Sequence, residues 1–447
     1  MPSELTEEIA GRLLRHDVSD YLRLRAACKA WRDCTDHPRD PLDARFRPRR
    51  WILLSNPYHY GATCAPRCRF LNTTTGACLH VDLPELEGHQ IEARTDGLLV
   101  LRDKASGAIS LLNPLTRGLT HLPSTSAALA GLSPPWAASS SGDDLRIAYA
   151  AISDETSPPT VALFIRGQSL WNIAYAKPGD EHWALIDHNG WNLLPNNQRL
   201  IRDGQQLRSI RYLSVVTHRG RIYFTTFQGN ILRLRLHPKP RLVPIVKDQS
   251  DMVWDNGAGV LYENVISYLV EPEDTHNGRM LMVRYHQTLG HLSAQEQRRI
   301  KQRKKNNILI KQLINDRPRR YKWQVLQVFE VDLLGKRLVP VEDIGHRSLF
   351  VGDVACVSLS AHKFPSIYGN AVYFGMNTHR CVAWGLCHLK DRSVEPKPMH
   401  FFEDRSTEPL GPGRTHPSLE KIVPAARPCR LEDYLVCYVG FKNGIKD

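Results

Sequence analysis

From residue 51 onward the sequence consists of short apolar runs separated by turn residues, and this pattern restricts the possible folds more than any other feature. The clearest unit spans 211–236, where Tyr212–Thr217, Arg221–Phe227 and the run after Gln228-Gly229 are three strand candidates. Glycine allows the positive φ that a tight hairpin turn needs. Apolar and polar residues alternate in the third run, as in a strand with one buried face. The unit is therefore predicted to be an antiparallel meander.

The same pattern recurs in looser form through the rest of the chain, and we find no helical period of useful length after residue 50 apart from a basic segment at 287–320. Many short antiparallel strands without intervening helices are compatible with a sandwich, a barrel or a propeller. About 390 residues are too many for one sandwich or small barrel, but they suit four-stranded blades of about 40–50 residues each. We therefore expect a mainly β protein built on a β-propeller of about six or seven blades.

Residues 1–36 differ from this pattern and predict two short amphipathic helices that meet at Arg15-His16-Asp17, a suitable helix end and new cap. Apolar residues follow helical spacing at Leu5, Ile9 and Leu13 in the first helix and at Tyr21, Leu24, Cys28 and Trp31 in the second. A module of about 40 residues is usually too small to be stable unaided. The apolar stripes must therefore meet either the rest of this chain, as a helical cap, or another protein.

The residues of this module closely resemble the F-box, in the pattern Pro2-x-Glu4-Leu5-x3-Ile9-x3-Leu13-Leu14 followed by Leu24-Arg-Ala-Ala-Cys28-Lys-Ala-Trp31-Arg32. F-box proteins dock this module onto the adaptor subunit of a cullin-RING ubiquitin ligase. The resemblance implies that the adaptor-binding residues are Pro2, Leu5, Ile9, Leu13, Leu24, Cys28 and Trp31. Met1 stands where the family usually has Leu, and Ala27 where a larger aliphatic residue is common, so we expect an N-terminally clipped module.

A second resemblance lies between 344 and 374, in Ile344-Gly-His-Arg-Ser-Leu-Phe-Val-Gly352, Ser358-x-Ser360-Ala361-x-x-Phe364-Pro365 and Gly369-Asn370-x-Val372-Tyr373-Phe374. This combination resembles plant F-box proteins with an F-box-associated propeller of the domain-of-unknown-function 295, KIB type. Arg47–Trp51, Tyr268–Glu271 with Leu281–Arg284, and Glu403–Pro409 resemble other stretches of the same family, so the similarity covers most of 1–419.

These patterns together predict the domain organisation. We expect a helical F-box-like module at 1–36, a linker at 37–50, and a propeller at 51–419 that contains the basic insert 287–320. Residues 420–447 form a C-terminal extension with a strand-like run at Tyr434–Val439.

Charge is concentrated in the basic insert. Residues 298–320 contain ten Lys or Arg against one Asp, which supplies +9 of the net charge of +13. A general nucleic-acid-binding surface is therefore not indicated. The insert itself has three interpretations: a solvated loop between strands, an acidic or nucleic-acid partner site, or a nuclear-import signal at Arg298, Arg299, Lys301, Arg303, Lys304 and Lys305.

Motifs for catalysis are missing from the sequence: it has no nucleophile elbow, phosphate loop or HExxH motif. Its ten cysteines follow no disulfide framework or zinc-ligand spacing, so we expect reduced thiols and neither a metal nor a cofactor. No apolar run is long enough to span a membrane, and the acidic N-terminus is typical of neither a secretory signal nor a transit peptide. The chain is thus expected to act in the nucleus or cytoplasm without a membrane partner.

The sequence therefore predicts a non-catalytic binding protein, the substrate-recognition subunit of an F-box-type (SCF) cullin-RING ubiquitin ligase. The helices would bind the ligase adaptor, and the propeller would bind an unknown protein target destined for degradation. The alternative is an adaptor-independent propeller scaffold with a vestigial F-box. A propeller enzyme, which would need a metal or acid cluster at the central channel, is the third hypothesis.

Overall fold

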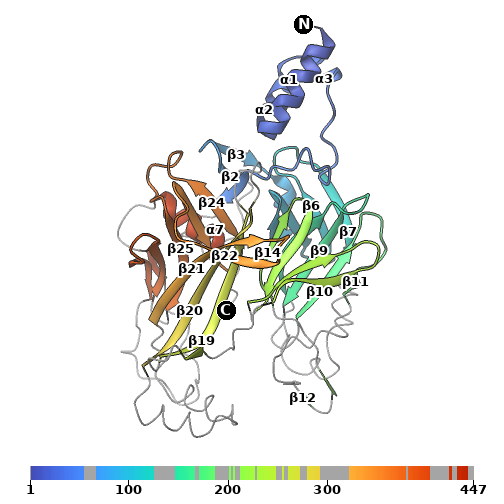
Figure 1. Ribbon diagram of the computed structural model, residues 1–447. Helices are drawn as coiled ribbons and strands as arrows, with labels where there is room; N and C mark the ends of the chain where they lie inside the picture. Colours follow the sequence, from blue (N-terminus) through green and yellow to red (C-terminus); the bar gives the residue numbers. More distant parts are fainter. Residues whose placement is uncertain are drawn as a thin grey trace, which may run out of the picture.

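The structure is a computed structural model that describes residues 2–54, 67–124, 146–166, 171–186, 201–202, 205–206, 212–226, 229–247, 254–255, 260–271, 279–291, 322–378, 381–402, 422–424 and 430–440. Three short helices stand on one face of a ring of antiparallel sheets, and the start of the first helix points away from the ring (Figure 1). None of the helices in these ranges is both long and apolar enough to cross a membrane.

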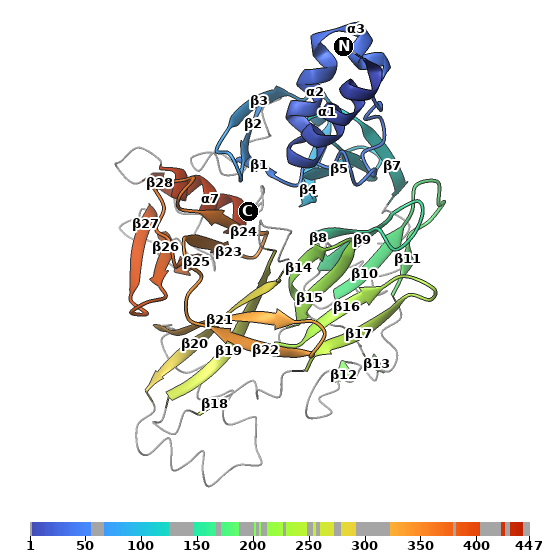
Figure 2. The same ribbon diagram turned by 45° about the horizontal axis from the view of Figure 1, so that its top comes forward.

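Six sheets form the blades of a β-propeller, which confirms the mainly β prediction and sets the blade number (Figure 2). The first blade contains β1 (Trp51–Leu54), β2 (Arg67–Asn72) and β3 (Cys78–Asp82), and the second contains β4 (His89–Thr95), β5 (Leu98–Asp103), β6 (Ala108–Leu112) and β7 (Leu119–Ser124). The third blade contains β8 (Arg146–Ser153), β9 (Thr160–Arg166), β10 (Trp171–Ala176) and β11 (Ala184–Leu185). The fourth contains β14 (Tyr212–His218), β15 (Arg221–Thr226), β16 (Ile231–Arg235) and β17 (Arg241–Val246). A 3-10 turn, η1 (Pro84–Leu86), joins the first two blades.

The last two blades are larger. The fifth contains β18 (Trp254–Asp255), β19 (Val260–Val270), β20 (Leu281–His291), β21 (Lys322–Asp332) and β22 (Arg337–Val341). The sixth contains β23 (Arg347–Val351), β24 (Cys356–Ser360), β25 (Ala371–Thr378), β26 (Cys381–His388), β27 (Val394–Phe402) and β28 (Ile422–Pro424), with β23 and β25 parallel. A separate two-stranded ribbon is formed by β12 (Ile201–Arg202) and β13 (Gln205–Gln206).

The core is divided among the seams between neighbouring blades. In β5, Leu98 and Val100 pack in the cluster shared with the third blade, while Leu99 and Leu101 pack in the cluster shared with the first. Successive side chains of a strand point to opposite faces, so a blade between two neighbours needs apolar residues at every position. This arrangement explains why many strands are continuous apolar runs and do not alternate.

The C-terminal region contains a helix, α7 (Leu431–Gly440), so the strand-like interpretation of Tyr434–Val439 and the expectation of no further helix outside the basic insert are wrong. Its buried side chains Leu435, Val436 and Val439 pack with residues of the sixth and first blades. A short, almost continuously apolar run cannot be assigned to strand or helix by periodicity alone. The signal was at its start, where the Asp433 carboxylate accepts a hydrogen bond from the Arg430 backbone N–H at 2.9 Å, as in a helix cap.

The N-terminal module has three helices, α1 (Ser3–His16), α2 (Val18–Ala27) and α3 (Lys29–Asp33), where two were expected. The predicted second helix breaks at Cys28, whose backbone is extended and whose sulfur caps α3 by accepting a hydrogen bond from the Trp31 N–H. The break at Asp17 was predicted correctly: its carboxylate caps α2 by accepting a hydrogen bond from the Ser19 N–H at 2.7 Å.

Candidate functional site

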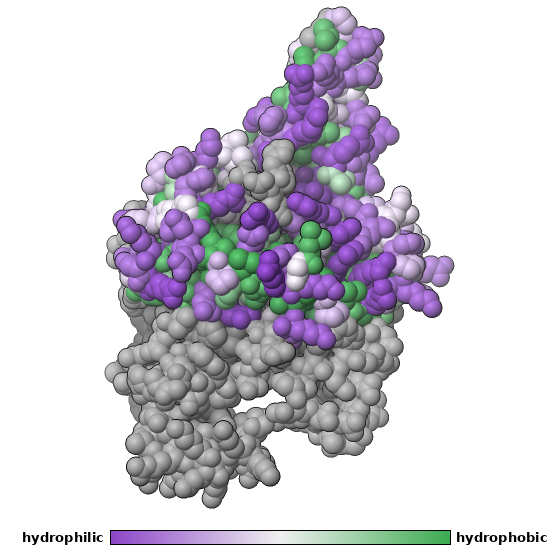
Figure 3. Space-filling model, in the orientation of Figure 1, coloured by the Kyte–Doolittle hydropathy of each residue, from purple (hydrophilic) through white to green (hydrophobic). Residues whose placement is uncertain are grey.

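The helical module leaves part of its apolar surface uncovered. Its core consists of Ala10 and Tyr21 together with Phe46 of the linker, and Leu14 and Leu24 pack against them. On α1, Leu5 is 50% exposed and Ile9 is 40% exposed. α1 lies in the part of the molecule that projects from the propeller (Figure 1), and Figure 3 shows hydrophobic residues among hydrophilic ones on that part. The propeller therefore does not bury the stripe of α1.

The seven residues that the F-box resemblance singled out are divided by the structure into two groups. Six lie on the surface or at its edge: Pro2, Leu5, Ile9 and Cys28 are exposed, and Leu13 and Trp31 are partly exposed. Leu24 is also partly exposed, but it packs against the core of the module, so it supports the fold of the helices. The six Lys and Arg residues of the possible import signal, at 298–305, lie outside the described residues.

Asp17 connects the helical module to the propeller, a role that sequence analysis missed. Besides capping α2, its Oδ1 accepts a hydrogen bond from the Trp51 indole N–H at 2.9 Å. Its Oδ2 accepts one from the Asn72 side-chain amide at 2.5 Å. Trp51 and Asn72 pair across β1 and β2 of the first blade. Next to them, the Arg50 guanidinium donates to the His16 carbonyl oxygen. Hydrogen bonds to an ionised carboxylate are among the stronger ones in proteins.

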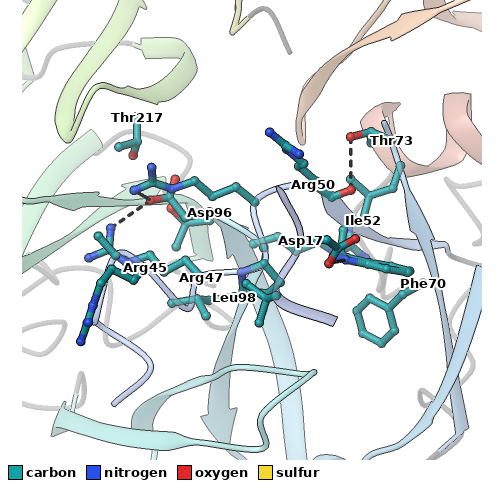
Figure 4. A pocket seen from close by; sticks show the side chains of 18 of the residues that line it. Asp17, Arg45, Arg47, Arg50, Ile52, Phe70, Thr73, Asp96, Leu98 and Thr217 are labelled. Atoms are coloured by element: carbon teal, nitrogen blue, oxygen red, sulfur yellow. Dashed lines mark hydrogen bonds and ion pairs between the residues drawn. The ribbon is translucent and has the colours of Figure 1, made fainter. Parts of the chain in front are cut away.

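The segment predicted as a linker lies on the propeller face and is held there by Arg47. The Arg47 side chain is fully buried and forms ion pairs with Asp96 at 3.1 Å and Asp154 at 2.6 Å. Asp96 lies between β4 and β5 of the second blade, and Asp154 follows β8 of the third. In the turn between β4 and β5, the Asp96 carboxylate accepts a hydrogen bond from Arg47 (Figure 4).

Glycine makes the close approach of the linker possible. A Cβ at Gly97 would clash with the carbonyl oxygen of Pro48, and its φ of +79° is in the left-handed region that glycine favours. The Asn113 side-chain amide also donates to the Phe46 carbonyl oxygen at 2.9 Å. Further out, Arg45 bonds the carboxylates of Asp43 and Asp36. The hydrogen bond from Arg45 lowers the pKa of Asp43.

A cavity of about 1020 Å³ lies between the helical module, the linker and the propeller face. Its wall includes Glu7 of α1, Arg49 and Arg50 of the linker, and Glu271 at the end of β19. Positive and negative side chains both contribute, so charge alone does not select one class of ligand. Within the described part of the chain, no three His, Cys, Asp or Glu side chains gather in a way that could hold a metal ion.

The architecture defines the class of protein first: a six-bladed β-propeller that carries a short helical module on one face. A family model described as the KIB1-4 beta-propeller matches residues 70–400, and the chain belongs to this family. No curated protein sequence matches the chain.

The solved structures that match this chain include two propeller domains. The Cps50 (Swd1) beta-propeller domain of Myceliophteria thermophila is 10% identical, with a TM-score of 0.30, and the match covers 77% of this chain and 86% of that one. The WD40 domain of SCAP from fission yeast is 7% identical, with a TM-score of 0.27 and coverage of 78% and 81%. Scores this low do not establish a common fold, so the assignment rests on the family match and the sheet topology.

Proposed function

We propose that the protein is the substrate-recognition subunit of an F-box-type cullin-RING ubiquitin ligase. The helical module would bind the ligase adaptor, and the propeller would hold a protein target. The observation that carries this proposal is the uncovered apolar stripe on α1, where Leu5 and Ile9 are exposed although the module already has a core of its own. A cap that served only the propeller would bury this stripe against it.

Two further observations support the proposal. The residues on and next to this stripe carry the F-box resemblance, and the family match places a KIB1-4 propeller behind them. Catalysis would belong to the other ligase subunits, because a receptor accelerates transfer by bringing a target lysine close to the charged ubiquitin carrier. We further propose a nuclear or cytoplasmic location, which imaging of the protein with Gln in place of the six basic residues at 298–305 would test.

The test is the affinity for the purified adaptor, measured by calorimetry for the wild-type protein and the Leu5→Asp/Ile9→Asp variant. Burial of each side chain contributes about 1.5–3 kcal/mol. Loss of both should therefore weaken binding by at least about 100-fold. Leu334→Asp is the matched control, because Leu334 is 97% exposed on the propeller and far from α1 in sequence. It should bind like the wild type.

The alternative function is an adaptor-independent scaffold, and one observation favours it. The hydrogen bonds of Asp17 attach the module to the first blade, as expected for a helical cap. If the wild-type protein does not bind the adaptor while circular dichroism shows folded helices, the scaffold function replaces the receptor function.

A further inference from the structure

Two sets of side-chain contacts to propeller carboxylates and amides stand out among those that hold the helical module and its linker on the propeller, and we call them anchors. The first is the Asp17 carboxylate, which joins the corner between α1 and α2 to Trp51 and Asn72 of the first blade. The second is Arg47, which joins the linker to carboxylates of the second and third blades. Figure 4 shows Asp17 and the Arg47–Asp96 pair apart from each other at the pocket. With one anchor the helical module could still pivot about it, whereas two anchors fix both the tilt and the rotation of the module relative to the propeller.

The second anchor cannot loosen without leaving charge unpaired in the interior. The Arg47 side chain has no exposed surface, and the Asp96 side chain is only 8% exposed. Separating such a pair leaves a buried, uncompensated charge, which is strongly unfavourable. The first anchor is simpler to remove, because both of its donors from the first blade converge on a single carboxylate. The Asp17 side chain is therefore the contact on which the direction of the helices depends most directly.

We propose that Asp17 is a positioning residue that fixes the direction of the helical module relative to the propeller, so that the ligase presents ubiquitin to a restricted set of lysines. This inference rests on the proposed receptor function. Asp17 touches no substrate, and it acts by holding α1 and α2 in place. Geometry of this kind matters because a misplacement of about 1 Å can cost about 100-fold in rate.

The variant that isolates this role is Asp17→Ser. Serine is as good an N-cap as aspartate, so α2 keeps its start. The shorter hydroxyl group cannot replace both carboxylate oxygens in their hydrogen bonds to Trp51 and Asn72. Asp20→Ser is the matched control on the same helix, because the Asp20 carboxylate pairs with the exposed Arg23 of α2 itself.

The first measurement is the distribution of distances between probes placed through unnatural amino acids at Glu8 of α1 and Asp82 of β3, both exposed. We expect one narrow distribution for the wild type and for Asp20→Ser, and a broad one for Asp17→Ser with unchanged helix content. A narrow, unshifted distribution for Asp17→Ser would overturn the proposal. This measurement needs no adaptor, so it shows whether Asp17 fixes the direction of the helical module even if the receptor function is refuted.

The second measurement is ubiquitin transfer to the protein's own lysines in a ligase reconstituted with adaptor, cullin and RING subunits, with modified positions mapped by mass spectrometry. For Asp17→Ser we expect unchanged adaptor affinity, a rate lower by about 10-fold, and a wider set of modified lysines. A broad distance distribution together with an unchanged rate and lysine set would refute the role of Asp17 while leaving the receptor function intact. Absence of adaptor binding by the wild type would instead refute the receptor function.

Discussion

The C-terminal helix α7 should stabilise the whole ring, and Leu435→Ala tests this directly. Leu435 has no exposed surface and lies in the seam between the sixth and first blades. Backbone N–H groups of Val354 and Ala355 also donate to the Val439 carbonyl oxygen, at 2.9 and 3.3 Å. The helix thus closes the ring at the seam where the two ends of the propeller sequence meet.

The size of the effect follows from burial. Replacing a fully buried Leu by Ala costs about 2–5 kcal/mol, and about 3 kcal/mol is reasonable for a seam packed from both sides. The unfolding entropy is about 2.1 cal/mol/K per residue, or roughly 0.9 kcal/mol/K for a chain of this length. The melting temperature should therefore fall by about 3 °C.

The assay is differential scanning calorimetry of Leu435→Ala beside Leu334→Ala, which makes the same truncation at a side chain that is 97% exposed. The control should change stability by less than about 0.5 kcal/mol. Hydrogen exchange in the Leu435→Ala variant should increase first in β1 and β23, which α7 contacts. Equal melting temperatures for the two variants, with unchanged exchange at the seam, would refute the idea that α7 closes the ring.

Three further predictions concern the linker contact, acid stability and thiol reactivity. Gly97→Ala should destabilise the protein more than Gly179→Ala, because both have positive φ but only Gly97 faces a linker carbonyl group; chemical denaturation compares them. Hydrogen bonds from the backbone N–H and hydroxyl group of Ser106 lower the pKa of Asp103 below its usual 3.8. The stabilisation from this carboxylate is therefore complete above pH 3.8 and is lost as the pH falls through the lower pKa of the folded state. In thermal melts, the melting temperatures of Asp103→Asn and the wild type should therefore converge below about pH 4. Burial raises the pKa of the Cys387 thiol to about 11, so native alkylation at pH 8 should modify the exposed Cys28 well before Cys387, and equal rates would contradict this.

Much of the propeller was predictable because its signals are local. Turn residues such as Arg219-Gly220 separate the strands, and both φ values in that turn are positive, as a tight hairpin requires. The blade number remained open between six and seven, because the count depends on how strands group into sheets. Strand grouping is decided by hydrogen bonds between residues far apart in sequence, such as the parallel pairing of Ser348 with Ala371.

The candidate site was predictable only in part. Helical spacing identified the stripe that contains Leu5 and Ile9, but the same spacing could not show that Leu24 packs against the module's core. The role of Asp17 had one visible signal, its position at the helix break. Its partners Trp51 and Asn72 are 34 and 55 residues away, and nothing in the local sequence relates them to it.

The sequence by itself determined the class of fold, a ring of antiparallel blades preceded by amphipathic helices, because hydrophobic periodicity and turn residues act over a few positions. The tertiary structure alone decided where those parts meet. It turned the run at Tyr434–Val439 into a helix that closes the ring, and it placed the linker arginine Arg47 between carboxylates of two blades. The physical reason is that burial and ion pairing depend on which distant segments share a space, which no local pattern encodes.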